Sequence, residues 1–109
     1  SIYRDYINLA GAVIASKNYE KISSEQRPFF IHSVQVGSDA DIYGIWKDCW
    51  IKYVNASIPK SLSDIAKITE GKKEINLITS CYTSRQGFLT LDYSVRLELE
   101  KDKIEYIKR

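Results

Sequence analysis

The sequence is poor in several residues that mark particular classes of protein. Its 109 residues include two cysteines, one histidine and no methionine. Two cysteines cannot hold a chain of this length together as a disulfide-rich scaffold, so the fold has to rest on an apolar core. Two cysteines and one histidine at these separations also match no zinc-ligand spacing. We therefore expect no metal site, and no motif in the chain indicates a cofactor.

The chain also lacks long hydrophobic runs and an excess of charge of one sign. No apolar stretch approaches the roughly 20 residues that a membrane-spanning helix needs, so no membrane span is expected. Sixteen Lys and Arg stand against fourteen Asp and Glu, and the basic residues near the end of the chain have acidic neighbours. A phosphate-binding face needs uncancelled positive charge, so we expect no nucleic-acid partner. With 44% hydrophobic residues, the composition predicts one globular domain over residues 1–109.

The first half of the chain shows helical spacing of its apolar residues. This spacing predicts a helix over residues 2–14 and a short second helix over 19–24. Residues 29–36 fit either a strand or a helix. The strongest stripe predicts a helix over residues 39–54, capped at its start by Ser38 or Asp39. That stripe consists of Ile42, Ile45, Trp46, Cys49, Trp50 and Tyr53.

The second half changes to a period of two, which is typical of half-buried strands. Strands are predicted at 65–68, 74–83, 89–100 and 104–107. The longest carries six alternate apolar residues, namely Leu89, Leu91, Tyr93, Val95, Leu97 and Leu99. Together the two halves predict an α+β fold in which N-terminal helices (1–58) pack on one face of a curved antiparallel β-sheet, a meander over 62–109. In this prediction the tryptophan-bearing helix covers the leucine-lined face of the sheet.

Two short phrases carry a resemblance to a known superfamily. Asn18-Tyr19-Glu20-Lys21-Ile22 opens the predicted second helix, and Lys103-Ile104-Glu105-Tyr106-Ile107 forms the last strand. With this order of elements, the chain resembles small exported bacterial proteins of the nuclear transport factor 2-like superfamily. The resemblance implies a cone-shaped fold around a cavity, in a superfamily that includes both enzymes and non-catalytic binding domains. No residue here matches the catalytic positions of those enzymes, so none is assigned.

Cys49 and Cys81 form the most informative pair. Cys49 lies on the buried stripe of the predicted central helix, and Cys81 lies on the apolar side of its predicted strand. Both side chains then point at the same core, where a disulfide would form if the Cα atoms came within about 7 Å. Two buried free thiols acting as small apolar residues are the alternative. The sequence leaves both open.

The aromatic residues are the remaining candidates for a site. Most belong to the core by their periodicity, but the Trp N–H and Tyr O–H groups need polar partners, and a pocket or a protein interface supplies such partners. The lone His32 is interpreted as a packed or capping residue rather than a catalytic one. The candidate pocket or interface aromatics are Trp46, Trp50, Tyr53, Phe29, Phe30 and Phe88.

These observations favour a non-catalytic binding domain over an enzyme. We expect a protein partner or a homodimer, with an immunity, inhibitor or accessory protein among the forms that such a domain takes. The alternative is a cavity protein or an enzyme of the cone type that binds a small apolar ligand. The resemblance and the cysteine pair favour a periplasmic or secreted location, and the residues leave a cytoplasmic one open.

Overall fold

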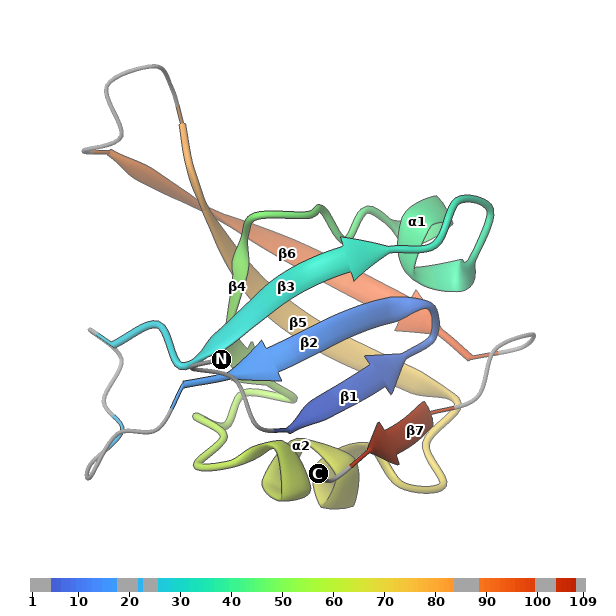
Figure 1. The fold of residues 1–109 in the computed structure, drawn as a ribbon. Helices are drawn as coiled ribbons and strands as arrows, with labels where there is room; N and C mark the ends of the chain where they lie inside the picture. Colours follow the sequence, from blue (N-terminus) through green and yellow to red (C-terminus); the bar gives the residue numbers. More distant parts are fainter. Residues whose placement is uncertain (1–4, 18–21, 23–25, 84–88, 100–103, 108–109) are drawn as a thin grey trace.

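One antiparallel sheet dominates the computed structural model, which describes residues 5–17, 22, 26–83, 89–99 and 104–107 (Figure 1). All of its neighbouring strands run antiparallel, and their order across the sheet is β6-β5-β4-β3-β2-β1-β7. The strands are β1 Tyr6–Leu9, β2 Ala12–Ser16, β3 Phe29–Val34, β4 Trp50–Val54, β5 Glu74–Tyr82, β6 Thr90–Glu98 and β7 Ile104–Ile107.

Two short helices accompany the sheet. Helix α1 (Asp39–Tyr43) contacts β6, and α2 (Leu62–Thr69) contacts β7 and β1. Figure 1 shows α1 beside one end of β3 and β6 and α2 along the opposite side of the molecule. Neither helix has the length and apolar character needed to cross a membrane, which holds for the residues that the structure describes.

The predicted arrangement of helices and sheet is wrong. Four strands, β1 to β4, lie within residues 1–58, the part predicted to be helical. The sheet therefore draws on both halves of the chain, and no layer of N-terminal helices covers its C-terminal half. Helices and strands are both present, as predicted, but the helices are short and come after the third strand.

The predicted N-terminal helix is replaced by the β1–β2 hairpin. Leu9 pairs with Ala12 across a two-residue turn at Ala10 and Gly11, whose φ angles are 55° and 104°. Two consecutive residues with positive φ are what a tight hairpin turn requires, and glycine adopts such angles without strain. Gly11 therefore ends one strand and starts the next. The predicted helix at 19–24 lies outside the described residues, apart from Ile22.

The predicted long helix over 39–54 begins as expected and ends early. Ser38 caps α1 by accepting a hydrogen bond from the Asp41 backbone N–H, which confirms the predicted start. Gly44 then adopts a left-handed conformation (φ 97°), a common way for a helix to end. Residues 50–54 form β4, whose aromatic and β-branched residues favour a strand.

Helix α2 occupies the place of the strand predicted at 65–68. The Ser61 side chain accepts a hydrogen bond from the Asp64 backbone N–H at 2.9 Å and so caps the helix. Leu62, Ile65 and Thr69 are buried on one side, at helical spacing. The other predicted strands of this half are confirmed as β5, β6 and β7, and residues 29–34 form β3.

One face of the sheet, here called the inner face, carries most of the core. Alternate residues of β5 are buried there, as are Val95 and Leu97 of β6. The two helices close this face with Ala40 from α1 and with Leu62 and Ile65 from α2. Beyond the other strands, β5 and β6 continue as a pair (Figure 1). At this extension Leu89 and Leu91 are more than half exposed.

Candidate interaction surface

The inner face of β6 changes from buried to exposed along the strand. Val95 and Leu97 expose 4% and 0% of their surface, whereas Leu89, just before the strand, and Leu91 expose 70% and 52%. All four have the same parity and point to the same face of the sheet. The chemistry of these side chains is the same, so the difference comes from what lies over them.

Helix α1 supplies the cover at the Val95–Leu97 end, and the β1–β2 turn holds the helix there. The Ala40 backbone N–H donates to the Ala10 carbonyl at 3.0 Å, and the Gln35 N–H donates to the Gly11 carbonyl at 2.9 Å. These hydrogen bonds dock the start of α1 on the tip of the hairpin.

The fit between the turn and the helix leaves no space for a side chain on Gly11. A Cβ atom placed there would lie 2.2 Å from the Cβ of Ser38, the residue that caps α1. The Ser38 hydroxyl also donates to the Gln35 carbonyl at 2.7 Å, which keeps the loop before the helix close to the turn. Gly11 is thus needed both for its backbone conformation and for this close approach.

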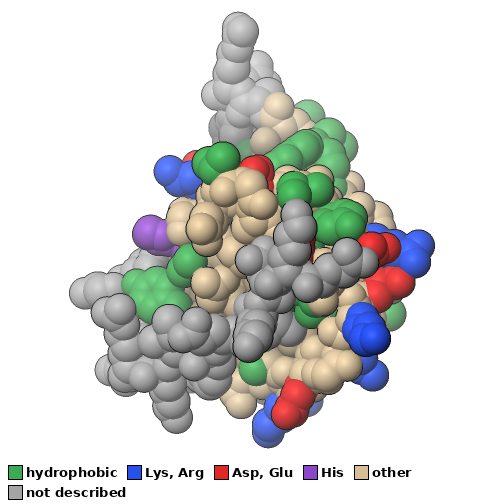
Figure 2. Space-filling view, turned by 90° about the vertical axis from the view of Figure 1, so that its right-hand side faces the viewer, with side chains coloured by type: hydrophobic (Ala, Val, Ile, Leu, Met, Phe, Trp, Pro, Cys, Tyr) green, Lys and Arg blue, Asp and Glu red, His purple; other side chains and the backbone are tan. Residues whose placement is uncertain are grey.

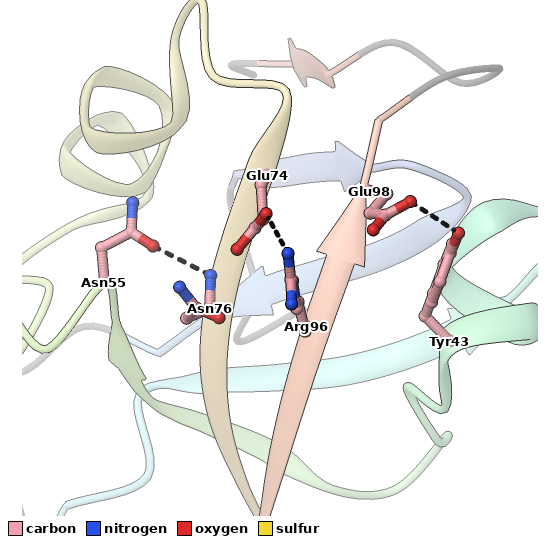
Figure 3. A network of polar contacts seen from close by, with 6 residues as sticks. All are labelled: Tyr43, Asn55, Glu74, Asn76, Arg96 and Glu98. Atoms are coloured by element: carbon pink, nitrogen blue, oxygen red, sulfur yellow. Dashed lines mark hydrogen bonds and ion pairs between the residues drawn. The ribbon is translucent and has the colours of Figure 1, made fainter.

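Polar contacts hold the covered end of β6 at the free edge of the strand and on the outer face of the sheet, which is the face opposite the inner one (Figure 3). The Tyr43 hydroxyl of α1 donates to a Glu98 carboxylate oxygen at 3.2 Å, and Tyr43 lies on the side of β6 away from β5. Arg96 and Glu74 form an ion pair at 2.7 Å between β6 and β5, which raises the pKa of Arg96 above its ordinary value. Tyr43 therefore closes the free edge of β6 at this end.

The exposed end of β6 contacts one apolar side chain from the loop after α1, and a second apolar side chain is exposed on α1 itself. Trp46 is 52% exposed and packs edge-on against Tyr93, with ring centroids 4.9 Å apart. Ile42, on α1, is 59% exposed. Figure 2, which views the molecule from the side of α1, shows hydrophobic side chains gathered over its upper part. We call the group formed by Ile42, Trp46, Leu89, Leu91 and Tyr93 the α1–β6 surface.

A disulfide between Cys49 and Cys81 lies at the boundary between the covered and exposed ends. The two Cα atoms are 4.5 Å apart, so the bridged state left open by the sequence is the one present. Cys49 precedes β4 and does not lie on a helix, which corrects one reason for expecting the bridge. Cys81 pairs with Leu91 across β5 and β6. The disulfide thus ties the loop that carries Trp46 to the strand beside Leu91.

A second aromatic cluster lies on the outer face of the sheet. The guanidinium of Arg27 lies over both the Trp50 ring, at 4.6 Å, and the Tyr82 ring, at 5.2 Å. The two rings are themselves 5.4 Å apart. Cation–π contacts of this kind stabilise a structure by about 0.5–2 kcal/mol. Trp50 is buried, and the Arg27 guanidinium already lies over the Trp50 ring and over the Tyr82 ring. We therefore interpret this cluster as structural.

Asp92 lies next to this cluster, on the outer face of β6. It forms an ion pair with Lys52 at 3.0 Å and stands opposite the buried Ser80 in the strand register. Among the described residues the Ser80 hydroxyl has no partner at regular hydrogen-bond geometry. Its interaction with the carboxylate is nevertheless the main cause that lowers the pKa of Asp92, ahead of the hydrogen bond from Lys52.

The six aromatic residues proposed from the sequence do not form one group. Trp46 belongs to the α1–β6 surface, whereas Trp50 lies on the outer face, so the shared helical stripe predicted for them is wrong. Phe29 is part of the core, and Phe30 and Tyr53 are half-buried on β3 and β4. Phe88 lies outside the described residues.

The lone histidine and the two cysteines are held in structural contacts. His32 is exposed on β3 and packs edge-on against Tyr6, while both cysteines are oxidised in the disulfide. No group of three His, Cys, Asp or Glu side chains among the described residues is arranged to hold a metal ion. A depression beside Phe29, Ile51 and Pro59 has a volume of about 10 Å³, enough for roughly one water molecule.

Sequence reasoning missed three members of the α1–β6 surface. It placed Leu89, Leu91 and Ile42 in the core, whereas all three are more than half exposed. Gly44 is the signal that would have revealed this, because a glycine five residues after a helix start often ends a helix. A helix that short cannot cover six alternate residues of a long strand.

Comparison of the chain with models of protein families, with curated proteins and with solved structures gives no match.

Proposed function

We propose that this protein is a non-catalytic binding domain that associates with another protein molecule through the α1–β6 surface. The observation that carries the proposal is the run of exposed apolar side chains from α1 to the far end of β6. Ile42, Trp46, Leu89 and Leu91 each expose more than half of their surface. Contiguous exposed apolar groups on a small protein are typical of binding sites, because leaving them in water is unfavourable.

The composition of the surface favours a protein as the partner. Large aromatic and aliphatic side chains near the centre, with charges at the rim, are typical of protein interfaces. Trp46 and Tyr93 supply the aromatic centre, and the Lys52–Asp92 ion pair lies on the opposite face of the sheet. A nucleic acid would need unpaired cations along its binding face, whereas the five residues that form the α1–β6 surface are all uncharged.

The surface is also held ready for binding. The Cys49–Cys81 disulfide fixes the loop that carries Trp46, and the contacts of Ser38 and Tyr43 fix α1. A surface that is ordered before binding loses little conformational entropy when the complex forms. A rigid apolar patch is therefore better suited to specific association than a mobile one.

The proposal includes an oxidising compartment, either the periplasm or the extracellular space. The disulfide supports it, since such bonds persist mainly outside the reducing cytosol. An immunity, inhibitor or accessory protein fits a small domain of this kind. We do not extend the proposal to a cone-type enzyme, because the first of the two N-terminal helices behind that resemblance is a hairpin.

Site-specific photo-crosslinking tests the proposal. A benzophenone amino acid is placed at position 91, on the α1–β6 surface, and in a matched variant at Lys67, which is exposed on α2. The variants are produced in the native host and irradiated. We expect the variant with the crosslinker at position 91 to form adducts with another protein molecule. Their yield should be several times the yield of adducts from the variant with the crosslinker at position 67. Equal yields, or no intermolecular adduct from position 91, would contradict the proposal.

A further inference from the structure

Strand β6 forms one edge of the sheet, and its main chain offers hydrogen bonds on the free side. The Leu99 N–H donates to the Lys73 carbonyl at 2.8 Å, and the Leu89 carbonyl accepts from the Thr83 N–H at 2.9 Å. In an antiparallel pair, residues bonded to the neighbouring strand alternate with residues bonded away from it. Odd-numbered residues of β6 therefore bond to β5, and Thr90, Asp92 and Ser94 direct their N–H and C=O groups outward. Within the described part of the chain, no strand pairs with this edge.

The free edge is closed at one end and open at the other. Tyr43 lies beside it at Glu98, as Figure 3 shows, and blocks a further strand there. From Leu89 to Ser94 every residue except the half-buried Tyr93 is exposed. Proteins often protect open edges with charged residues. The one charge in this stretch belongs to Asp92, and Lys52 pairs with it at 3.0 Å, so this protection is weak.

We propose that the open end of β6 pairs with the same segment of a second copy of this chain. This inference rests on the proposed function and names the protein that binds. The two strands run antiparallel about a two-fold axis through Leu91, the usual symmetry of a homodimer. Leu91 then lies opposite Leu91 of the second copy, Thr90 opposite Asp92 of the second copy, and Leu89 opposite Tyr93 of the second copy.

Charge and shape select this register over those shifted toward Ser94. An axis through Asp92 would place two carboxylates directly opposite each other, which destabilises a strand pair. An axis through Tyr93 or Ser94 would bring the second strand against Tyr43 at the closed end. The axis through Leu91 avoids both conflicts, and each Thr90 hydroxyl can donate to the Asp92 carboxylate of the second copy.

The same register covers the apolar groups that are now exposed. Side chains of paired residues lie on the same face of the extended sheet, so Leu89 and Leu91 of both copies meet on the inner face. Leu89 of the second copy comes to lie against Tyr93, next to Trp46, which already packs on that ring at 4.9 Å. Two identical surfaces thus bury each other, with main-chain hydrogen bonds along the edge.

A charge-exchange experiment at position 91 tests both the dimer and its axis. Leu91→Asp and Leu91→Lys are prepared with the disulfide intact, and their mass in solution is measured by analytical ultracentrifugation, beside the unaltered protein. We expect the unaltered protein to dimerise and each variant alone to be monomeric, with a dissociation constant raised roughly tenfold or more by like charges on the axis. An equimolar mixture of the two variants should form a heterodimer, because Asp then faces Lys.

Matched controls and a second measurement keep the test decisive. Val36, which is 91% exposed in the loop between β3 and α1, is changed to Asp and should leave the dimer unaffected. In the unaltered protein, amide exchange at Thr90 and Asp92 should slow as the concentration rises, while exchange at Leu91 does not change. A protein that is monomeric at every concentration, or a mixture that stays monomeric, overturns the inference. Crosslinks from position 91 to a different protein would then leave the proposed function standing.

Discussion

The two ends of β6 make the most instructive comparison in this molecule. Val95 and Leu97 at one end, and Leu89 and Leu91 at the other, follow the same alternation and point to the same face. The first pair lies in the core that α1 helps to cover, whereas the second pair is more than half exposed. Alternation of apolar residues therefore determines the face on which a side chain lies, whereas burial depends on an element encoded some fifty residues earlier.

Loss of the disulfide at the boundary between the two ends should have the largest effect on stability. In the double variant Cys49→Ala, Cys81→Ala, the bridge between residues 32 apart is absent. Closure of a loop of this length stabilises a fold by about 4 kcal/mol through the entropy of the unfolded chain. We expect the free energy of unfolding, measured in urea, to fall by about that amount. Reduced unaltered protein should unfold at the same urea concentration as the variant, and a clear difference would mean that the alanines have effects of their own.

Truncation of one leucine at each end compares the two ends directly. Leu97→Ala should lower the free energy of unfolding by about 3 kcal/mol, because it leaves a cavity beneath α1. Leu91→Ala should lower it by less than about 1 kcal/mol, because its side chain is already half in water. Urea unfolding of both variants, at a concentration too low for self-association, provides the measurement. Equal losses would show that the two ends are covered alike.

Gly11→Ala should weaken the cover over the buried end. Alanine at a positive φ costs about 1–2 kcal/mol, and its Cβ would collide with Ser38, which must shift. We expect a loss of roughly 2–4 kcal/mol, together with faster amide exchange in α1 and at Val95 and Leu97. Gly71→Ala is the control, because its φ is also positive (70°) but no atom lies within 4 Å of the added Cβ. A loss no larger than that of the control would contradict the docking of α1 on the hairpin turn.

The smallest predicted effect concerns the pH dependence of stability at the exposed end. Ser80 and then Lys52 lower the pKa of Asp92 below its ordinary value of 3.8. The carboxylate therefore stabilises the fold above pH 3.8 and loses this contribution as the pH falls through the lowered pKa. We expect Asp92→Asn to be slightly less stable than the unaltered protein at pH 7, with a difference that shrinks as the pH falls below 3.8. If the stability difference between the two proteins grew toward acid pH, the pKa of Asp92 would be raised by folding rather than lowered, which would contradict this prediction.

The sequence predicted the long strands better than the short elements, and it left the state of the two cysteines open. Strands β5 and β6 alternate over nine residues each, which is long enough to exclude a helical period. The segment of β1 and β2 has apolar residues at both helical and strand spacings, and only the positive φ of Ala10 and Gly11 separates the two. Gly11, a residue that is unfavourable inside a helix, marks the turn between the two strands.

The candidate surface was harder to predict, because the burial of a side chain depends on a covering element that is distant in the sequence. Trp46 was identified as an interface candidate from the sequence, but Leu89 and Leu91 were assigned to the core. Their exposure depends on the early end of α1 at Gly44 and on the extension of β5 and β6 beyond the other strands. Both are properties of the tertiary structure, and local periodicity contains no information on them.

Carbene footprinting of the purified protein tests the central claim, that one end of β6 is exposed and available for a second copy. Labelling by a photoactivated diazirine is quantified residue by residue by mass spectrometry, in dilute and in concentrated protein. The account predicts strong labelling of Leu89 and Leu91 in dilute protein, a marked decrease in concentrated protein, and little labelling of Val95 and Leu97 in either. Similar labelling of both pairs in dilute protein, or labelling of Leu91 that does not depend on concentration, would contradict it.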